Sequence, residues 1–462
     1  MARYFKFHTR AELEAECSRL GLDLRFSEDI SPLFRPVVLG PLRAGNSLCI
    51  QPMEGCDGTL DGQADELTFR RFRRFGGGGA KLIWGEATAV VEEGRANPRQ
   101  LLINYATAPD LQRMLHDCRR AHREACGSDD DLVVGLQLTH SGRHSHARPL
   151  PVFHDPLLDP RTLDANDALL DDDYLKRLAD HYVSAARLAR DIGFQFVDVK
   201  QCHRYLLSEL LAAKTRPGPY GGSIENRTRL ARDIIIRIRS EVPDLVVASR
   251  FNVYDGIPYR KGAGGEGEPC PWEPPVRSAW GACEHDPLQV DLSEPLWWAG
   301  EMVRLGVTLL NVSMGNPYAT MHVIRPFEYP PPDGYETPEH PLVGVDRHFR
   351  LAGQVQQALP GVPVVGSGYS YLQEFLMPAG AANVRDGRIT LVGVGRAALP
   401  QPDLVRQIQE HGRLDRKRVC RTFSYCTALM RAKHNELGQF PTGCPPFDKE
   451  VYGPIWEQAR EQ

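Results

Sequence analysis

The stretch "VDVKQCHRYLLSELL", from Val197 to Leu211, begins as a strand and ends as a helix. A short apolar run stops at Lys200, a polar turn follows, and a run rich in leucine then begins. This order of strand followed by helix recurs along the chain from about residue 47 onward. Alternation of this kind predicts helices packed against a mostly parallel sheet.

Eight short apolar runs are candidates for the strands of that sheet. Most are continuous rather than alternating, which is typical of parallel strands buried on both faces. Eight strands, each followed by a helix, predict a TIM (β/α)8 barrel, whereas an open doubly wound sheet more usually has five to seven strands. The runs are "SLCIQPM" (47–53), "AKLIWGE" (80–86), "LVVGLQLTH" (132–140), "FQFVDVK" (194–200), "LVVASRFN" (245–252), "VTLLNVS" (307–313), "VPVVGSG" (362–368) and "ITLVGVG" (389–395).

Residues 1–411 are predicted to form the barrel, and 412–462 a short C-terminal extension that is a small appendage. A long insertion at about 257–290, dense in Gly, Pro and Trp, follows the fifth strand. Loops of this length are usually lids or binding loops, or are disordered. We expect this insertion to shape the substrate pocket from the C-terminal face, where a second long loop (325–341) also lies.

Composition and charge narrow the possible partners. Charged residues make up 25% of the chain and the formal net charge is −4, so neither nucleic acid nor an acidic membrane is expected to bind. No apolar run approaches a membrane span, and the N-terminal residues lack the apolar core of a signal peptide. Eleven scattered cysteines indicate reduced thiols. We expect a cytoplasmic protein with a small-molecule substrate, and oligomerisation remains open.

Side chains at the carboxyl ends of barrel strands are candidates for chemistry. Lys200, His203 and Tyr205 lie at such an end. A tyrosine can donate a proton, and a lysine or histidine can hold a developing oxyanion. The alternative is that none of them has a catalytic role. Lys200 would then be a charge at the barrel rim, His203 a loop histidine and Tyr205 an aromatic residue at a helix start. Cys202 fits a small buried filler better than a nucleophile.

Two glycine-rich turns end the last two strand candidates, in "VVGSGY" (364–369) and "GVGRAA" (393–398). Loops after the seventh and eighth strands form the usual phosphate site of barrel enzymes. Arg396 would add a charge-assisted contact. Either turn alone can be a tight turn without a ligand, but the pair favours a cofactor that carries phosphate.

The chain resembles the old yellow enzyme family of FMN-dependent oxidoreductases, in its 2,4-dienoyl-CoA reductase and trimethylamine dehydrogenase-like branch. The resemblance covers roughly residues 30–410 and implies FMN held across the strand mouths of a TIM barrel. The segments that carry it are "IQPMEG" (50–55), "LQLTHSGRHS" (136–145), "RPGPYGGSIENRTRL" (216–230), "SRFN" (249–252) and "GVGRA" (393–397).

The resemblance also implies a role for each matching position. Lys200 and His203 take the place of a substrate clamp, and Tyr205 that of the proton donor. A second set should contact FMN: the ring, its pyrimidine edge and its phosphate. These residues are Pro52, Met53, Glu54, Ala87, Gln137, Arg250, Gly366, Ser367, Gly368, Gly395 and Arg396.

Two positions depart from the family pattern. Lys200 stands where the family has His or Asn, so the clamp is charged unless burial lowers the pKa of this lysine. Glu54 stands where a Thr or Cys commonly touches the flavin. An ionised carboxylate facing the ring would disfavour the anionic reduced flavin, but the side chain can equally point away as a solvated or paired acid.

The extension contains part of the cysteine pattern of the iron–sulfur branch. Cys420, Cys426 and Cys444 offer three thiolates, whereas a [4Fe–4S] cluster wants four. We therefore expect no cluster; a three-cysteine cluster, or a zinc site completed by His434, is the alternative. No dinucleotide-binding GxGxxG follows a strand in this part of the chain. Electrons are expected from NAD(P)H at the flavin or from a separate electron-transfer partner.

These observations predict an FMN-dependent NAD(P)H:acceptor oxidoreductase that reduces an activated C=C bond with Tyr205 as proton donor. One alternative is an FMN-dependent amine or C–H dehydrogenase that passes electrons to a partner. Another is a flavoprotein scaffold or subunit with weak activity of its own.

Overall fold

The computed structural model describes residues 4–164, 167–433 and 436–461. Eight parallel strands close into a barrel in which β12 pairs with β3. Each strand overlaps one of the eight predicted runs, so the predicted TIM barrel is confirmed. The strands are β3 (Leu48–Ile50), β4 (Leu82–Ala89), β5 (Val133–Thr139), β6 (Phe196–Val199), β7 (Val246–Asn252), β10 (Leu309–Ser313), β11 (Val364–Gly366) and β12 (Leu391–Val394).

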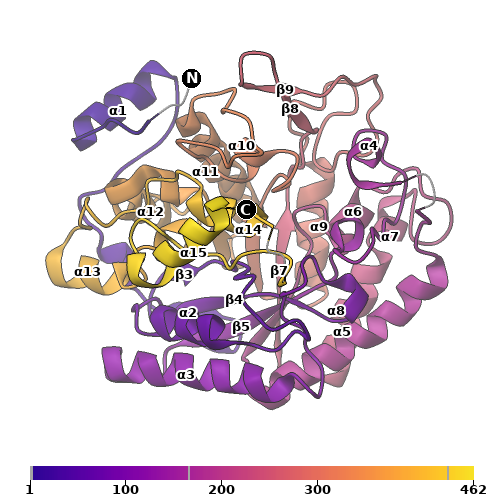
Figure 1. The fold of residues 1–462 in the computed structure, drawn as a ribbon, viewed down its shortest axis with the longest axis horizontal. Helices are drawn as coiled ribbons and strands as arrows, with labels where there is room; N and C mark the ends of the chain where they lie inside the picture. The colour runs from indigo at the N-terminus through magenta and orange to yellow at the C-terminus, as the bar shows by residue number, and fades with distance from the viewer. Residues whose placement is uncertain (1–3, 165–166, 434–435, 462) are drawn as a thin grey trace.

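A layer of helices surrounds the strands (Figure 1). One long helix follows each barrel strand, as the alternating pattern predicts. These helices are α2 (Glu66–Gly76), α3 (Ala108–Cys126), α5 (Asp172–Ile192), α8 (Arg229–Glu241), α9 (Ser293–Arg304), α11 (Pro341–Ala358), α12 (Leu376–Arg385) and α13 (Leu404–His411). Further helices lie in the loops and at the start of the chain: α1 (Arg10–Arg19), α4 (Asp159–Thr162), α6 (Leu206–Leu211), α7 (Ile224–Arg227) and α10 (Met321–Ile324).

Local sequence signals explain where the longest helix begins and ends. The Asp171 side chain accepts a hydrogen bond from the Tyr174 backbone N–H and caps the start of α5. Gly193 ends the helix in a left-handed conformation with φ of 111°, which a glycine adopts without steric cost. The buried face of α5 includes Leu178 and Tyr182, at the spacing expected of an amphipathic helix.

A hairpin of β1 (Val37–Leu39) and β2 (Leu42–Ala44) belongs to the same buried cluster as the residues that fill the barrel interior. Trp84 and Phe196 meet edge to face in that cluster, with ring centroids 4.9 Å apart. The barrel is therefore a packed core, and its chemistry is left to the strand ends and the loops.

The insertion after β7 is folded. It contains a small antiparallel pair, β8 (Tyr259–Lys261) and β9 (Gly267–Pro269). Trp280 is buried, and its indole N–H donates to the Asn252 carbonyl at the end of β7 over 2.8 Å. The insertion is therefore tied to the barrel.

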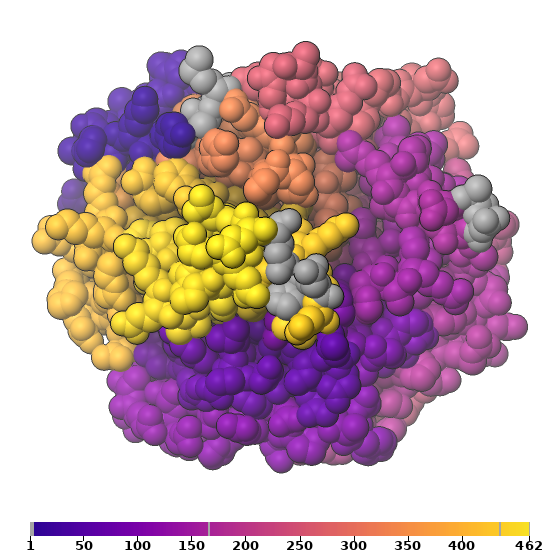
Figure 2. Space-filling model, in the orientation of Figure 1, coloured from indigo at the N-terminus to yellow at the C-terminus, as the bar shows by residue number. Residues whose placement is uncertain are grey.

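The extension contains α14 (Tyr425–Arg431) and α15 (Lys449–Glu461). It is spread over the face turned toward the viewer in Figure 2, where it is drawn in yellow. Asp448 ties it to α2, since its carboxylate accepts from Arg70 over 2.8 and 2.9 Å and from Arg74 over 2.5 Å. In the part of the chain that the structure describes, no helix is long and apolar enough to cross a membrane.

Candidate active site

A pocket opens at the carboxyl ends of the barrel strands, the end at which barrel enzymes place their active sites. Gly366 lies within β11 and is not among the residues that line it. Every other predicted site residue of the barrel lines the pocket, namely Pro52, Met53, Glu54, Ala87, Gln137, Lys200, His203, Tyr205, Arg250, Ser367, Gly368, Gly395 and Arg396.

Asp198, a buried carboxylate in β6, fixes the floor of this pocket. It accepts from Gln137 Nε2 over 2.6 Å, from the Trp84 indole over 2.8 Å and from the Arg250 backbone N–H over 2.7 Å. Burial raises the pKa of Asp198 to about 6, against the effect of these donors. Two residues predicted to contact the cofactor are thus oriented by an acid that the sequence interpretation did not include. The sequence did contain a signal for this residue, because an aspartate inside the apolar run "FVDV" is unusual.

The turn after β6 brings Lys200, His203 and Tyr205 together. His203 and Arg204 adopt left-handed conformations, with φ of 68° and 61°, which residues other than glycine rarely do. Arg204 is buried and forms ion pairs with Asp155 and with Asp255, the second at 3.1 Å. These pairs hold the strained turn, and the turn places Tyr205 at the N-terminus of α6.

The three side chains differ in charge. Lys200 Nζ lies 3.7 Å from the centroid of the Tyr205 ring, and burial lowers the pKa of this lysine. His203 Nε2 lies 2.9 Å from Ser313 Oγ, and burial lowers the pKa of His203 well below 6.5. Burial raises the pKa of the Tyr205 phenol well above 10. The site therefore offers a lysine whose positive charge is disfavoured by burial, beside an imidazole that is neutral and a phenol that is protonated at neutral pH.

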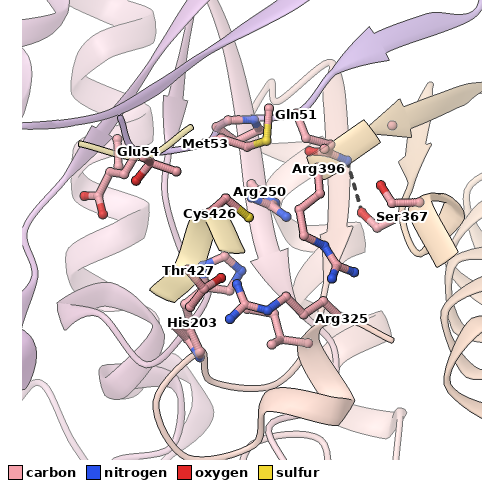
Figure 3. Close-up of a pocket in the computed structure, with 18 of the residues that line it drawn as sticks. Gln51, Met53, Glu54, His203, Arg250, Arg325, Ser367, Arg396, Cys426 and Thr427 are labelled. Carbon is pink, nitrogen blue, oxygen red and sulfur yellow. Dashed lines mark hydrogen bonds between the residues drawn. The ribbon is translucent and has the colours of Figure 1, made fainter. Parts of the chain in front are cut away.

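Glu54 lines the pocket but is also paired. Gln100 Nε2 donates to its carboxylate over 2.5 Å and also donates to the Ala87 carbonyl over 3.0 Å. Burial raises the pKa of Glu54, and the charge of Lys200 opposes that shift. Figure 3 shows the carboxylate directed away from the guanidinium groups of Arg250 and Arg396. The structure thus favours the paired acid among the two orientations considered.

Two arginines converge on the other side of the pocket, beside Ser367 (Figure 3). Arg325 Nε and Nη2 and Arg396 Nη1 are buried and make no hydrogen bond to any described residue. Burial, followed by the charge of Arg396, lowers the pKa of Arg325 to about 9, and burial also lowers that of Arg396. Two buried like charges with unused donors form a site for an anion. The long loop that contains Arg325 is visible in the sequence, but no motif there singles out this residue.

Comparison with known proteins identifies the family. Residues 32–264 match the NADH:flavin oxidoreductase / NADH oxidase family. This chain belongs to that family. An NADPH dehydrogenase from Geobacillus sp. (strain WCH70) is 28% identical over 249 residues, which are 50% of this chain and 68% of the relative. A NADH:flavin oxidoreductase from Gibberella zeae is 26% identical over 251 residues, which are 49% of this chain and 58% of the relative.

Solved structures share the fold. A 2-naphthoyl-CoA reductase in complex with 2-naphthoyl-CoA has a TM-score of 0.68 at 16% identity, covering 93% of this chain and 58% of that chain. An old yellow enzyme homologue from Zymomonas mobilis has a TM-score of 0.57 at 21% identity, covering 83% and 94%. The family match and these folds confirm the resemblance to old yellow enzymes.

FMN is the cofactor of this family of oxidoreductases, and the pocket fits it. The unused donors of Arg325 and Arg396 suit its phosphate, beside the turn at Gly368 with φ of 97°. At Gly393 an added Cβ would lie 2.0 Å from Gln51 Nε2, so this position has no room for a side chain. Met53 and Ala87 supply apolar surface for the ring system.

The walls of the pocket differ from the prediction in two respects. The insertion at 257–290 contributes no lining residue; the loop after β10 does so instead, through residues 317–318 and 324–326. The C-terminal extension also contributes to the pocket, which the sequence does not predict: Cys426, Thr427, Met430 and Thr442 line it. The Thr442 backbone N–H donates to the Gly55 carbonyl over 2.6 Å, which joins the extension to the loop after β3.

The three cysteines of the extension lie near one another. Cys420, Cys426 and Cys444 are all partly buried, and burial raises the pKa of Cys420 to about 11. Within residues 4–164, 167–433 and 436–461 no group of three or more His, Cys, Asp or Glu is arranged to hold a metal ion. His434, the proposed fourth zinc ligand, lies outside the described residues.

Proposed function

We propose that this protein reduces an activated C=C bond at the expense of NAD(P)H. The observation that carries the proposal is the meeting of a protonated phenol, Tyr205, with Lys200 and His203 in the cofactor pocket. FMN, when bound, accepts a hydride from NAD(P)H and passes a hydride to the acceptor. The side chains of the protein bind the cofactor, bind and orient the acceptor, and supply the proton.

Each group in the pocket has a distinct role. Arg325 and Arg396 hold the cofactor phosphate, while Gln137 and Arg250 hold the pyrimidine edge. Lys200 and His203 bind the carbonyl oxygen of the acceptor and stabilise the negative charge that grows there. Tyr205 then delivers its proton to the other carbon of the double bond.

The charges of the pocket favour an acceptor that becomes anionic during reduction. Lys200 and Arg250 line the pocket, and the Glu54 carboxylate accepts a hydrogen bond from Gln100. Enones and α,β-unsaturated thioesters develop enolate charge and suit this arrangement. A cationic amine does not, which argues against the amine dehydrogenase. The fold of 2-naphthoyl-CoA reductase adds support for including thioesters in a screen.

The decisive experiment separates the two half-reactions of Tyr205→Phe by anaerobic stopped-flow absorbance. We expect flavin reduction by NAD(P)H to stay at the wild-type rate. Flavin reoxidation by 2-cyclohexenone or crotonyl-CoA should slow by about 10²-fold or more, because the general acid is lost. Unchanged reoxidation would remove Tyr205 as the donor. If NAD(P)H never bleaches the wild-type flavin, a separate electron-transfer partner must supply electrons, and the dehydrogenase and scaffold hypotheses move ahead.

A further inference from the structure

Tyr205 must recover a proton after each turnover under the proposed function, on which this inference rests. The residue is only 4% exposed, so bulk water has little access to it. Since burial raises the pKa of its phenol well above 10, a phenolate left at this position takes up a proton readily from any donor within reach. The structure must therefore provide a route from solvent.

Tyr318 offers the next hydroxyl on the way out of the pocket. Its Oη lies 3.4 Å from Tyr205 Oη, and among the described residues the Tyr205 hydroxyl has no other hydrogen-bond partner. As a whole residue Tyr318 is 40% exposed, in contrast to Tyr205, although burial raises the pKa of its phenol to about 12. Tyr318 thus connects the Tyr205 hydroxyl in the pocket with a side chain that reaches solvent.

Tyr318 is held in place although it is partly exposed. Asn316 Oδ1 accepts from the Tyr318 backbone N–H over 2.8 Å and from the Ala319 N–H over 3.3 Å. The Tyr318 ring also packs against His144, with ring centroids 4.5 Å apart. Burial lowers the pKa of His144 to about 3, so this neighbour is neutral at pH 7. These contacts keep the hydroxyl within reach of Tyr205.

We propose that Tyr318 returns the proton from solvent to Tyr205. Once Tyr205 has protonated the acceptor carbon, the O–H bond of Tyr318 breaks and its proton passes to the Tyr205 phenolate. Tyr318 then takes a proton from water. Each reduced double bond gains a hydride that originates from NAD(P)H and a proton that originates from solvent, so atoms and electrons balance. Tyr318 acts through Tyr205 and does not need to touch the acceptor.

The test measures proton uptake separately from electron transfer. The FMN-loaded protein is reduced anaerobically and mixed with the faster of two acceptors, 2-cyclohexenone or crotonyl-CoA, in weak buffer with a fluorescent pH indicator. In Tyr318→Phe, which keeps the ring, the first flavin reoxidation serves as the internal time reference. Proton uptake should lag behind it by roughly tenfold or more, and added imidazole should shorten the lag.

Tyr329→Phe is the matched control, because Tyr329 lies 48% exposed further along the same loop. Its proton uptake should coincide with flavin reoxidation, as in the wild type. Coincident uptake in Tyr318→Phe, with FMN content and melting temperature unchanged, overturns the proposal. A lag in Glu54→Gln instead of Tyr318→Phe also overturns it, since Glu54 interacts electrostatically with both phenols. Failure of the proposed function is seen separately, as a Tyr205→Phe variant that reoxidises normally.

Discussion

Lys200 gives the pocket a charge that titrates below the usual range of a lysine. Burial lowers the pKa of Lys200, whereas burial raises that of Tyr205 well above 10. As the pH rises, Lys200 therefore loses its proton first, and the oxyanion loses a positive partner while the phenol is still protonated. We expect the rate of flavin reoxidation by an enone to fall as the pH rises through the lowered pKa of Lys200.

Lys200→Met should abolish this alkaline decline and slow reoxidation at neutral pH by about 10²-fold, the effect of removing one oxyanion partner. The measurement is reoxidation rate against pH for both proteins. Lys200→Arg is the control, because a guanidinium keeps its charge at alkaline pH and should flatten the profile while retaining much of the rate. An alkaline decline that persists in Lys200→Met would assign it to another group.

Arg325 and Arg396 are expected to destabilise the FMN-free protein and to stabilise the FMN-bound protein. Two buried guanidinium groups repel each other until a dianionic phosphate lies between them. Arg325→Met should therefore raise the melting temperature of the FMN-free protein. It should also weaken FMN binding by about 1.5 to 3 kcal/mol, or roughly 10- to 150-fold in Kd.

Fluorescence titration with FMN tests the weaker binding, and thermal melts of the FMN-free protein test the higher melting temperature. Arg304→Met is the control, since Arg304 is exposed and pairs with Glu301 on α9. A variant of Arg325 that loses stability without FMN and still binds FMN normally would show that this arginine has a structural role only.

At the scale of elements, the turn between β6 and α6 decides where the proton donor lies. Arg204 binds two buried carboxylates and the Ser278 carbonyl of the insertion, the last over 2.7 Å. The insertion thus contributes to the site indirectly. It fixes the turn between β6 and α6, although none of its residues lines the pocket. A lysine at this position keeps one charge but loses the fork of donors.

Arg204→Lys should slow flavin reoxidation about tenfold or more through displacement of Tyr205, while flavin reduction by NAD(P)H stays near the wild-type rate. Stopped-flow measurement of both half-reactions and a thermal melt provide the test. Arg237→Lys, at an exposed ion pair with Asp180, should change stability by no more than about 0.5 kcal/mol. Equal slowing of both half-reactions would indicate general loosening rather than a displaced donor.

The elements of the barrel were predictable because burial on both faces leaves a plain pattern. Every barrel strand overlaps a continuous apolar run, and Gly127 and Gly193 end their helices where expected. Strand ends also lie together by topology, so Lys200, His203 and Tyr205 were predictable as a group. The left-handed turn that joins them was not, because His203 and Arg204 have no local preference for it.

At the scale of the whole molecule, long-range contacts set the limit of the sequence interpretation. Arg325 and Tyr318 lie in a loop without a readable motif, and their partners are distant in sequence. The part that the extension takes in the pocket was not predictable for the same reason: Thr442 meets Gly55, and Asp448 meets Arg70, across almost the whole chain. Pairings of this kind leave no periodic trace in the sequence.

The C-terminal extension forms part of the pocket wall, and its position at the end of the chain has a consequence for biosynthesis. A ribosome makes all eight barrel strands before it reaches Cys426–Thr442, and elongation proceeds at about 5–20 residues per second. The strands can therefore pair while the wall is still missing. Capture of the cofactor behind a complete wall becomes a late step, so cells short of riboflavin should accumulate a folded barrel that can still be loaded after translation.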